Sequence, residues 1–355
     1  MQVVVIGAGA VGSFLAWTLA SAGHDVALLR RPGRAGTDGV EGAGGSAESE
    51  RSVRLVRPDG TTDAVTITVG PPSAPPDLIV LAVKMPDLAS ALDSAAAWPE
   101  STVLAAENGV GADAQVVSAR PNGGILAGSL TTAVGLEDGV IHRHSTGGIG
   151  LATVRSGAQG SFEAVTAESA ATAESVASAF RAGGLRAAVL ADPRSMRWSK
   201  LLANLVGNAT SAILDMDPAD VYADPRSFAI ERRQLREALA VMRRSGLVVC
   251  RLPGADVRGL ALAVRLPARL MRPILRRVVA AGRGGKSPSL RLAVRSGGPT
   301  EVDWLQGGVA TAAHALGGRA PVNERLATIV RECSADPGRA AWFRGRPDRL
   351  LDALD

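Results

Sequence analysis

The sequence predicts an α/β fold in which an N-terminal, doubly wound sheet is followed by an all-α C-terminal domain. Two observations carry this prediction. Short apolar runs alternate with helical stretches as far as residue 192, and beyond it helical patterns follow one another without strands. The 355 residues, 46% of them hydrophobic, suit two folded domains. We therefore expect domains over residues 1–192 and 193–355.

The first strand, over residues 2–6, leads through a glycine-rich turn into a helix over residues 13–22. The turn consists of Gly7, Ala8, Gly9, Ala10, Val11 and Gly12. Here Gly7 permits a tight turn, Gly9 lets the backbone approach a pyrophosphate, and Gly12 lets the helix pack on the strand. The helix N-terminus attracts the anion. The pattern predicts a Rossmann-type dinucleotide site, and the alternative is a glycine turn without a ligand.

The second strand, over residues 25–29, ends at Arg30 and Arg31. Folds that prefer NAD usually place an acidic residue here for the ribose hydroxyls, whereas arginine suits a 2′-phosphate. The pair therefore favours NADPH as the cofactor over NADH. The alternative is two solvated arginines.

The rest of the first domain is predicted from apolar runs, turn signals and an alanine-rich stretch. We expect a loop at 32–50, a hairpin at 51–69, strands at 77–83, 101–106 and within 123–151, a helix at 161–182, and a strand at 185–190. Lys84 and Asn108 each follow a strand, at the edge of the sheet where ligands lie. His142 and His144 are expected at the surface.

A polar stripe marks the helix expected over residues 196–214. At about 100° per residue, its members are Lys200, Asn204, Asn208 and Ser211. Asparagine is a poor helix former, and solvent-facing helix surfaces normally carry Glu, Lys or Arg. The stripe therefore predicts a polar wall lining a cleft, and the alternative is a solvated face.

Lysine is rare in this chain. Only Lys84, Lys200 and Lys286 are lysines among 39 basic residues. Codon bias toward arginine explains the count, but lysine can release a proton at an accessible pKa and arginine cannot. Chemistry would therefore retain a lysine where bias would replace it.

Three later segments have their own patterns. A helix is expected over 226–247. The arginine-rich segment 252–285, broken by Pro267 and Pro273, is expected to pack by its apolar side, and the alternative is contact with a membrane surface or an acidic partner. A further helix is expected to begin at Thr300, with Glu301 in its first turn.

Composition excludes several classes of protein. Two cysteines far apart make no disulfide framework, and four histidines without a cysteine cluster make no structural zinc site. The net charge of +5 is spread along the chain and does not argue for nucleic acid. We expect a cytoplasmic protein without a metal or a stable membrane insertion, and a homodimer is compatible with the sequence.

Taken together, the motifs resemble the ketopantoate reductase (2-dehydropantoate 2-reductase) family along most of the chain. They are Gly7–Gly12, Ala82-Val83-Lys84, Glu107-Asn108-Gly109-Val110-Gly111, Trp198-Ser199-Lys200 with Asn204 and Asn208, and Ser289 followed by Pro299-Thr300-Glu301-Val302-Asp303. The resemblance implies NADPH bound between a Rossmann domain and a helical domain. It also implies that Lys200 and Glu301 are catalytic.

The resemblance further assigns binding roles. Asn204, Asn208 and Ser289 would hold substrate, Asn108 would lie near nicotinamide and substrate, and Lys84 and Arg31 would contact the cofactor. The implied reaction reduces a 2-keto acid, with ketopantoate, a precursor in pantothenate biosynthesis, as the leading substrate. The alternatives are another ketone or imine substrate, or a non-catalytic NADPH sensor.

The chain departs from the family pattern at four places. Segments 32–50 and 254–286 are extended, Glu107 replaces the usual Gln or His, and Asp215-Met216-Asp217-Pro218 stands where the family can place a further substrate-binding Asn. The last departure bears on the substrate rather than on the chemistry.

Overall fold

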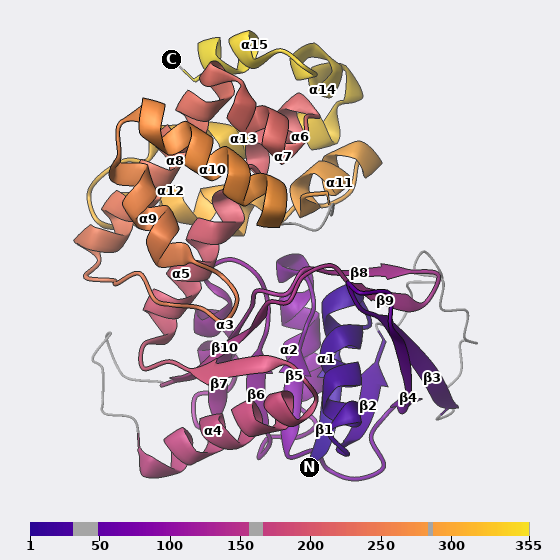
Figure 1. Ribbon diagram of the computed structural model, residues 1–355. Coiled ribbons are helices and arrows are strands. Elements are labelled where there is room, and N and C mark those ends of the chain that lie inside the picture. The colour runs from indigo at the N-terminus through magenta and orange to yellow at the C-terminus, as the bar shows by residue number, and fades with distance from the viewer. Residues whose placement is uncertain (31–48, 156–165, 283–286, 355) are drawn as a thin grey trace. The chain divides into compact units, whose positions relative to one another are not determined.

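The computed structural model describes residues 1–30, 49–155, 166–282 and 287–354 (Figure 1). Four parts of the sequence predictions lie outside the described residues. They are Arg31, most of the expected loop 32–50, residues 161–165 of an expected helix, and Lys286. The chain divides into two compact units. Unit 1 comprises Met1–Glu107, Ala112–Pro193 and Leu252–Gly254, and unit 2 comprises Asn108–Gly111, Arg194–Arg251 and Ala255–Asp355.

Unit 1 is built on one mixed sheet. Its strands are β1 (Gln2–Ile6), β2 (Asp25–Leu29), β3 (Ser49–Val56), β4 (Thr62–Val69), β5 (Leu78–Leu81), β6 (Thr102–Ala105), β7 (Ile125–Leu130), β8 (Val134–Glu137), β9 (Val140–Arg143), β10 (Gly148–Val154) and β11 (Arg186–Val189). The strand order among the described residues is β11-β10-β7-β6-β5-β1-β2-β4-β3-β9-β8. Strand β1 pairs in parallel with both β2 and β5. The order therefore reverses at β1, which is where doubly wound sheets bind ligands.

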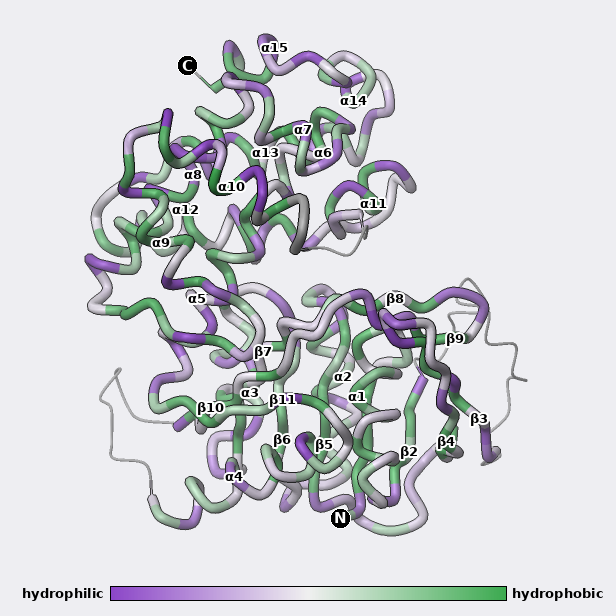
Figure 2. Tube along the Cα trace, in the orientation of Figure 1, coloured by the Kyte–Doolittle hydropathy of each residue, from purple (hydrophilic) through white to green (hydrophobic). Residues whose placement is uncertain are grey.

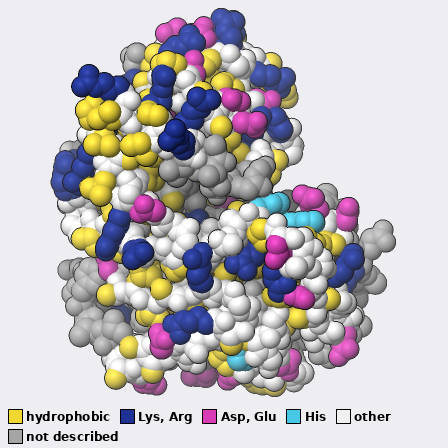
Figure 3. All heavy atoms as spheres, in the orientation of Figure 1, with side chains coloured by type: hydrophobic (Ala, Val, Ile, Leu, Met, Phe, Trp, Pro, Cys, Tyr) yellow, Lys and Arg dark blue, Asp and Glu magenta, His cyan; other side chains and the backbone are white. Residues whose placement is uncertain are grey.

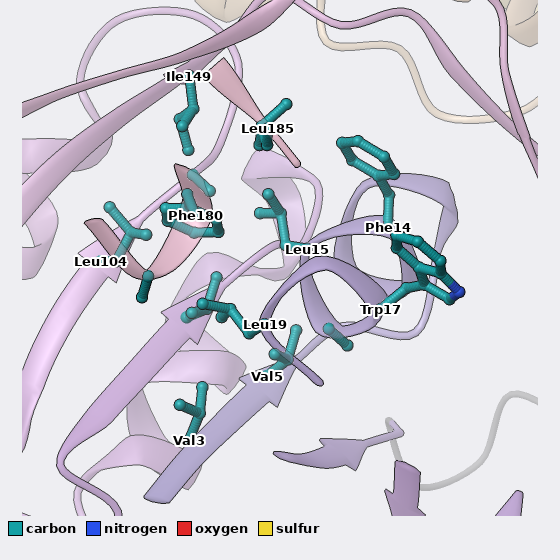
Figure 4. Close-up of a cluster of buried hydrophobic side chains, with 14 of the residues drawn as sticks. Val3, Val5, Phe14, Leu15, Trp17, Leu19, Leu104, Ile149, Phe180 and Leu185 are labelled. Atoms are coloured by element: carbon teal, nitrogen blue, oxygen red, sulfur yellow. The ribbon is translucent and has the colours of Figure 1, made fainter. Parts of the chain in front are cut away.

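Helices cover both faces of this sheet. They are α1 (Ala10–Ser21), α2 (Leu88–Ala95), α3 (Ala112–Ala119) and α4 (Ala167–Ala182), with a short 3₁₀ helix η1 (Met85–Asp87) before α2. Helix α1 packs on α4, and α2 packs on α3. Strand β5 is a continuous apolar run, and β1 and β6 are apolar after their first residue, because helices bury both faces of these strands. Figure 4 shows part of the resulting core, where Leu15 and Leu19 of α1 lie near Phe180 of α4, and Phe14 lies beside Trp17.

The expected hairpin is confirmed: β3 and β4 pair antiparallel around a turn in which Gly60 has φ +83°. Strand β10 also runs antiparallel to β7. Rings of the two histidines expected at the surface, His142 and His144, stack with centroids 6.3 Å apart, and both side chains are half-buried.

In its described part, unit 2 consists of helices and the loops that join them. Its helices are α5 (Pro193–Leu205, whose first residue belongs to unit 1), α6 (Ala209–Leu214), α7 (Pro218–Ala223), α8 (Pro225–Arg244), α9 (Val257–Arg265), α10 (Ala268–Gly282), α11 (Ser289–Ser296), the 3₁₀ helix η3 (Val302–Trp304), α12 (Gln306–Ala315), α13 (Pro321–Ala335), α14 (Pro337–Phe343) and α15 (Pro347–Asp352). Figure 2 shows hydrophilic and hydrophobic residues alternating along α8 and α10. No helix in the described ranges is long and apolar enough to cross a membrane.

The predicted extents of two helices in this unit are wrong. The helix over 196–214 is broken between α5 and α6, where Gly207 takes φ +59°, and Ser211 is fully buried instead of lying on a polar stripe. The helix expected to begin at Thr300 is instead η3 followed by α12, with Leu305 between them. Neither Glu301 nor Leu305, the residues before η3 and α12, caps its helix with a side-chain hydrogen bond.

The arginine-rich segment also differs from expectation. Its buried side carries Met271 and Leu275, whereas Leu270 and Ile274 are 51% and 46% exposed. The prediction that the segment packs by its apolar side is wrong for Leu266, Leu270 and Ile274, which are all exposed. Two helical stripes of apolar residues exist here, and a single helix face can bury only one of them.

Candidate active site

The glycine turn follows β1 at the point where the strand order reverses. A Cβ added to Gly12 would lie 1.7 Å from the Gly7 carbonyl oxygen, and one added to Gly7, whose φ is +116°, would lie 2.6 Å from the Ala82 carbonyl oxygen. At Gly9 an added Cβ would meet no atom within 4 Å. Two glycines therefore allow close backbone packing, and the third leaves open space beside the N-terminus of α1. An anionic group fits such a cradle.

The other residues expected around this turn lie at neighbouring strand ends. Lys84 is exposed and follows β5, two residues beyond the Ala82 carbonyl that touches the turn. Arg30 is half-buried directly after β2. Parallel strands β5, β1 and β2 are adjacent, so Lys84, the glycine turn and Arg30 share one edge of the sheet.

Asn108 lies in unit 2, on a short loop that leaves the sheet after β6. Gly109 has φ +91°, and a Cβ there would lie 2.6 Å from the Trp304 carbonyl oxygen. The same oxygen accepts a hydrogen bond of 3.1 Å from the Val110 N–H. Trp304 in turn donates its N–H to the Glu301 carbonyl oxygen at 3.1 Å. The loop is therefore fastened to the turn that carries Glu301.

Helix α5 carries Lys200 and Asn204 one turn apart, and both are half-buried. Asn204 donates through Nδ2 to Oδ1 of Asn108 across a long hydrogen bond of 3.5 Å. Two candidate residues almost a hundred positions apart are thus brought together within unit 2.

Two buried serines fix how α5 is rotated: Ser195, which the sequence did not single out, and Ser199, which was named there only as part of the Trp198-Ser199-Lys200 motif. The Oγ atoms of Ser195 and Ser199 accept hydrogen bonds from the backbone N–H groups of Val248 (3.1 Å) and Cys250 (2.7 Å). Serines four residues apart lie on one side of a helix, so Lys200, next to Ser199, is turned about 100° away from that anchored side. Ser199 therefore has a structural role beside Lys200, because its hydrogen bond helps to set the rotation of α5.

A fully buried carboxylate, also absent from the sequence prediction, holds the break between α5 and α6. Glu231 of α8 accepts hydrogen bonds from Gly207 N–H (2.7 Å), Thr210 Oγ1 (2.6 Å), Tyr222 OH (2.8 Å) and Gln234 Nε2 (2.7 Å). A buried charge needs such a set of donors. An acidic residue in an otherwise ordinary helix pattern gave no sequence signal of this role.

Asn208 precedes α6 and is only 4% exposed. Its Oδ1 accepts a hydrogen bond of 3.3 Å from the Leu290 N–H, at the first turn of α11. Ser289, the first residue of α11, is exposed and adjacent to that bond. Asn208 therefore joins the helix break to the segment that begins with Ser289.

The departure at Asp215 also connects α6 to α11. Asp215, at φ +52°, accepts hydrogen bonds from Arg291 Nε (2.9 Å) and Arg295 Nε (2.7 Å), and Asp217 pairs with Arg291 as well. Burial opposes ionisation of Asp215, but the hydrogen bonds from Arg295 and Arg291 outweigh it and lower its pKa. These side chains form an ion-pair cluster between α6 and α11.

The two cysteines are free, and burial raises the pKa of the Cys333 thiol to about 11. No group of three or more potential metal ligands occurs within the described segments.

Comparison with known proteins decides the family. The sequence model of "Ketopantoate reductase PanE/ApbA" matches residues 3–156, and that of its C-terminal domain matches residues 192–334. The 2-dehydropantoate 2-reductase of Halobacterium salinarum is 30% identical over 341 residues, covering 95% of this chain and 100% of that protein. The chain belongs to the ketopantoate reductase family. As a member it is an oxidoreductase acting on a carbonyl and hydroxyl pair.

Solved structures of other proteins share the fold. A ketopantoate reductase of this family from Ralstonia eutropha is 25% identical with a TM-score of 0.71, covering 94% of this chain and 98% of its own. D-Mandelate dehydrogenase, solved with NADH and anilino(oxo)acetate, is 18% identical with a TM-score of 0.72 and the same coverage. The fold class expected from the sequence, a doubly wound sheet with a helical C-terminal domain, is confirmed.

Proposed function

We propose that this member of the ketopantoate reductase family transfers a hydride from NADPH to the carbonyl of a 2-keto acid, with ketopantoate as the leading substrate and pantoate as the product. One observation carries the proposal. Within unit 2, Asn204, one helical turn from Lys200, donates a hydrogen bond to Asn108. Backbone hydrogen bonds through Trp304 join the loop of Asn108 to the turn that carries Glu301.

The cofactor proposal rests on the open space at Gly9 between two close-packed glycines, which fits a pyrophosphate. Arg30 and Arg31 are proposed to bind the 2′-phosphate, and Lys84 is proposed to contact the cofactor from the neighbouring strand end. When bound, the dihydronicotinamide supplies the hydride. The preference for NADPH over NADH rests on the two arginines.

Lys200 is proposed as the proton donor. Its ammonium would donate a hydrogen bond to the substrate carbonyl oxygen, stabilise the negative charge that develops there, and deliver the proton. Glu301 would orient that ammonium and accept a hydrogen bond from the new hydroxyl. The hydride forms the new C–H bond and the lysine proton forms the new O–H bond, so the reduction balances.

Neutral side chains are proposed to hold the substrate. Asn108, Asn204 and Ser289 present half-buried or exposed polar atoms for this purpose. Asn208 has its Oδ1 engaged by Leu290, so its Nδ2 would serve the substrate. Fixing the substrate before reaction lowers the entropic part of the barrier.

A second candidate is the reduction of a 2-keto acid other than ketopantoate. It is favoured by the Asp215 cluster, because Asp215 accepts hydrogen bonds from two arginines in the segment where the family resemblance allows a further substrate-binding Asn. The cytoplasmic location and the homodimer stay predictions.

The decisive variants are at Lys200. Lys200→Ala removes the proton donor and is expected to lower turnover at least about a thousandfold while NADPH affinity stays within about twofold. Lys200→Arg keeps the positive charge but cannot release a proton near neutral pH, so it should lose turnover as well. Steady-state kinetics and NADPH fluorescence titration measure both quantities. Turnover of Lys200→Ala at the parental rate would overturn the assignment.

A further inference from the structure

Helices α8, α9 and α10 of unit 2 present a surface on which arginine and large apolar side chains are mixed. We call it the arginine–leucine face. Its exposed members are Arg236, Arg243, Arg258, Arg265, Arg269, Arg276, Arg277, Val248, Leu262, Leu266, Leu270 and Ile274. Figure 3 shows hydrophobic and basic side chains side by side over the region of these helices. Five of the nine large hydrophobic residues exposed in the described chain lie on this face. Apolar exposure concentrated in this way marks an interaction site.

Helix α10 explains how the two residue types come together. Met271, Leu275 and Val279 point into the unit and are buried. At 100° per residue, Arg269, Arg272 and Arg276 follow on one flank of that buried stripe. Leu270 and Ile274 lie on the opposite flank and remain exposed. The helix thus has an anchored side, a cationic side and a free apolar side.

The cationic side borders a groove of about 890 Å³ between α8 and α10. Its lining includes no acidic residue. The seven arginines that line it are Arg232, Arg233, Arg236, Arg269, Arg272, Arg276 and Arg277. Burial, and then the charge of Arg236, lower the pKa of Arg232. A groove lined by seven arginines and by no acidic side chain favours an anionic partner.

A second hollow, of about 870 Å³, continues the same surface between α8 and α9. Arg236 and Arg265 belong to the face and line this hollow together with the exposed Val248 and Leu262. Both hollows therefore combine basic rims with apolar side chains.

Two hydrogen bonds hold the face in shape. Arg232 donates to the Leu266 carbonyl oxygen at 3.1 Å, which joins α8 to the turn between α9 and α10. Arg258 of α9 donates to the Val249 carbonyl oxygen at 3.2 Å. The arginine and leucine side chains are consequently presented by a folded scaffold.

From this geometry we propose that the arginine–leucine face docks unit 2 peripherally on a membrane surface that contains anionic phospholipid. Arginine pairs with lipid phosphates through its planar guanidinium, and exposed Leu, Ile and Val side chains enter the boundary between headgroups and acyl chains. A second copy of the chain would bring like charges together. A soluble polyanion would leave the apolar side chains in water.

Co-sedimentation of the full chain with vesicles tests the proposal. We expect binding to vesicles of phosphatidylcholine with 30% phosphatidylglycerol, weak binding to pure phosphatidylcholine, and loss of binding as salt rises. The double variant Arg269→Gln with Arg276→Gln should weaken vesicle affinity about thirtyfold. Leu270→Ser with Ile274→Ser should weaken it about tenfold or more.

Matched controls lie elsewhere on the surface. Arg54→Gln with Arg319→Gln removes two exposed arginines, and Val189→Ser with Leu292→Ser removes two exposed apolar side chains. All four double variants should keep the parental melting temperature and reductase activity, while only those on the face lose vesicle binding.

Three results would overturn the proposal: equal binding to neutral and anionic vesicles, unchanged binding by both face variants, or binding of polyphosphate or duplex DNA without binding of vesicles. The last result would assign the groove to a soluble polyanion. Because these assays do not involve turnover, their failure is distinguishable from failure of the proposed reductase function.

Discussion

Lys200 and Asn208 belong to one polar stripe predicted from the sequence, but they differ in burial and in their contacts. Lys200 stays half-buried on α5, next to a serine that anchors the helix. Asn208 is nearly inaccessible, and its Oδ1 receives the Leu290 N–H. Helical spacing predicted that both belong to one wall, but spacing cannot detect a helix break that depends on Glu231, more than twenty residues further along.

The two asparagines should therefore respond differently to truncation. Asn208→Ala leaves the buried Leu290 N–H without its acceptor and should lower the free energy of unfolding by about 1–3 kcal/mol. Asn204→Ala removes one long hydrogen bond from a half-buried site, so it should cost less than about 1 kcal/mol and act mainly by raising KM. Urea unfolding and steady-state kinetics measure both effects. Equal losses of stability in the two variants would contradict this difference.

At the scale of elements, the strand, turn and helix at the N-terminus were predictable because each glycine has a steric reason to be there. The 3₁₀ helix before α12 was not, since Thr300 and Asp303 resemble an N-cap pattern. The alternative geometry depends on Trp304, whose carbonyl oxygen accepts from a loop nearly two hundred residues earlier. Local sequence does not contain such a contact.

Substitutions at Gly9 and Gly12 should have different effects, one on cofactor binding and the other on folding. Gly9→Ala enters open space at a φ of −79°, so the melting temperature should change little, while the affinity for NADPH should fall about tenfold or more. Gly12→Ala places a methyl group 1.7 Å from the Gly7 oxygen and should destabilise the fold itself. Thermal unfolding and fluorescence titration distinguish them. If Gly9→Ala bound NADPH with the parental affinity, the proposal that this turn binds the pyrophosphate would be contradicted.

The junction of α6 and α11 should depend on pH through Asp215. Its pKa is lowered from 3.8 in the folded chain, so its ion pairs contribute stability above the unfolded value, and that contribution is lost as pH falls through the folded pKa. Asp215→Asn, which tolerates the left-handed backbone, should cost about 2 kcal/mol at pH 7. Urea unfolding should show the parent and variant converging in acid. A constant difference across the range would show that charge plays no part.

At the scale of the whole molecule, the doubly wound sheet followed by helices follows from alternating and non-alternating apolar patterns, and the solved structure from Ralstonia eutropha shares this fold class. The exposed apolar flank of α10 was not predictable in this way. A sequence pattern shows that two apolar stripes exist, but which one is buried depends on the helices that pack against α10, including α7 and α9. Likewise, the amphipathic pattern around Arg269 and Leu270 does not say whether a partner covers it.

The central claim, reduction of a 2-keto acid with NADPH, is tested most directly by following the nicotinamide absorbance with the purified chain and a panel of 2-keto acids that includes ketopantoate. We predict turnover of at least one of them, ketopantoate foremost, with NADPH preferred over NADH and with turnover abolished in Lys200→Ala. Tight NADPH binding without turnover of any substrate in the panel would contradict the claim and would favour a non-catalytic NADPH sensor.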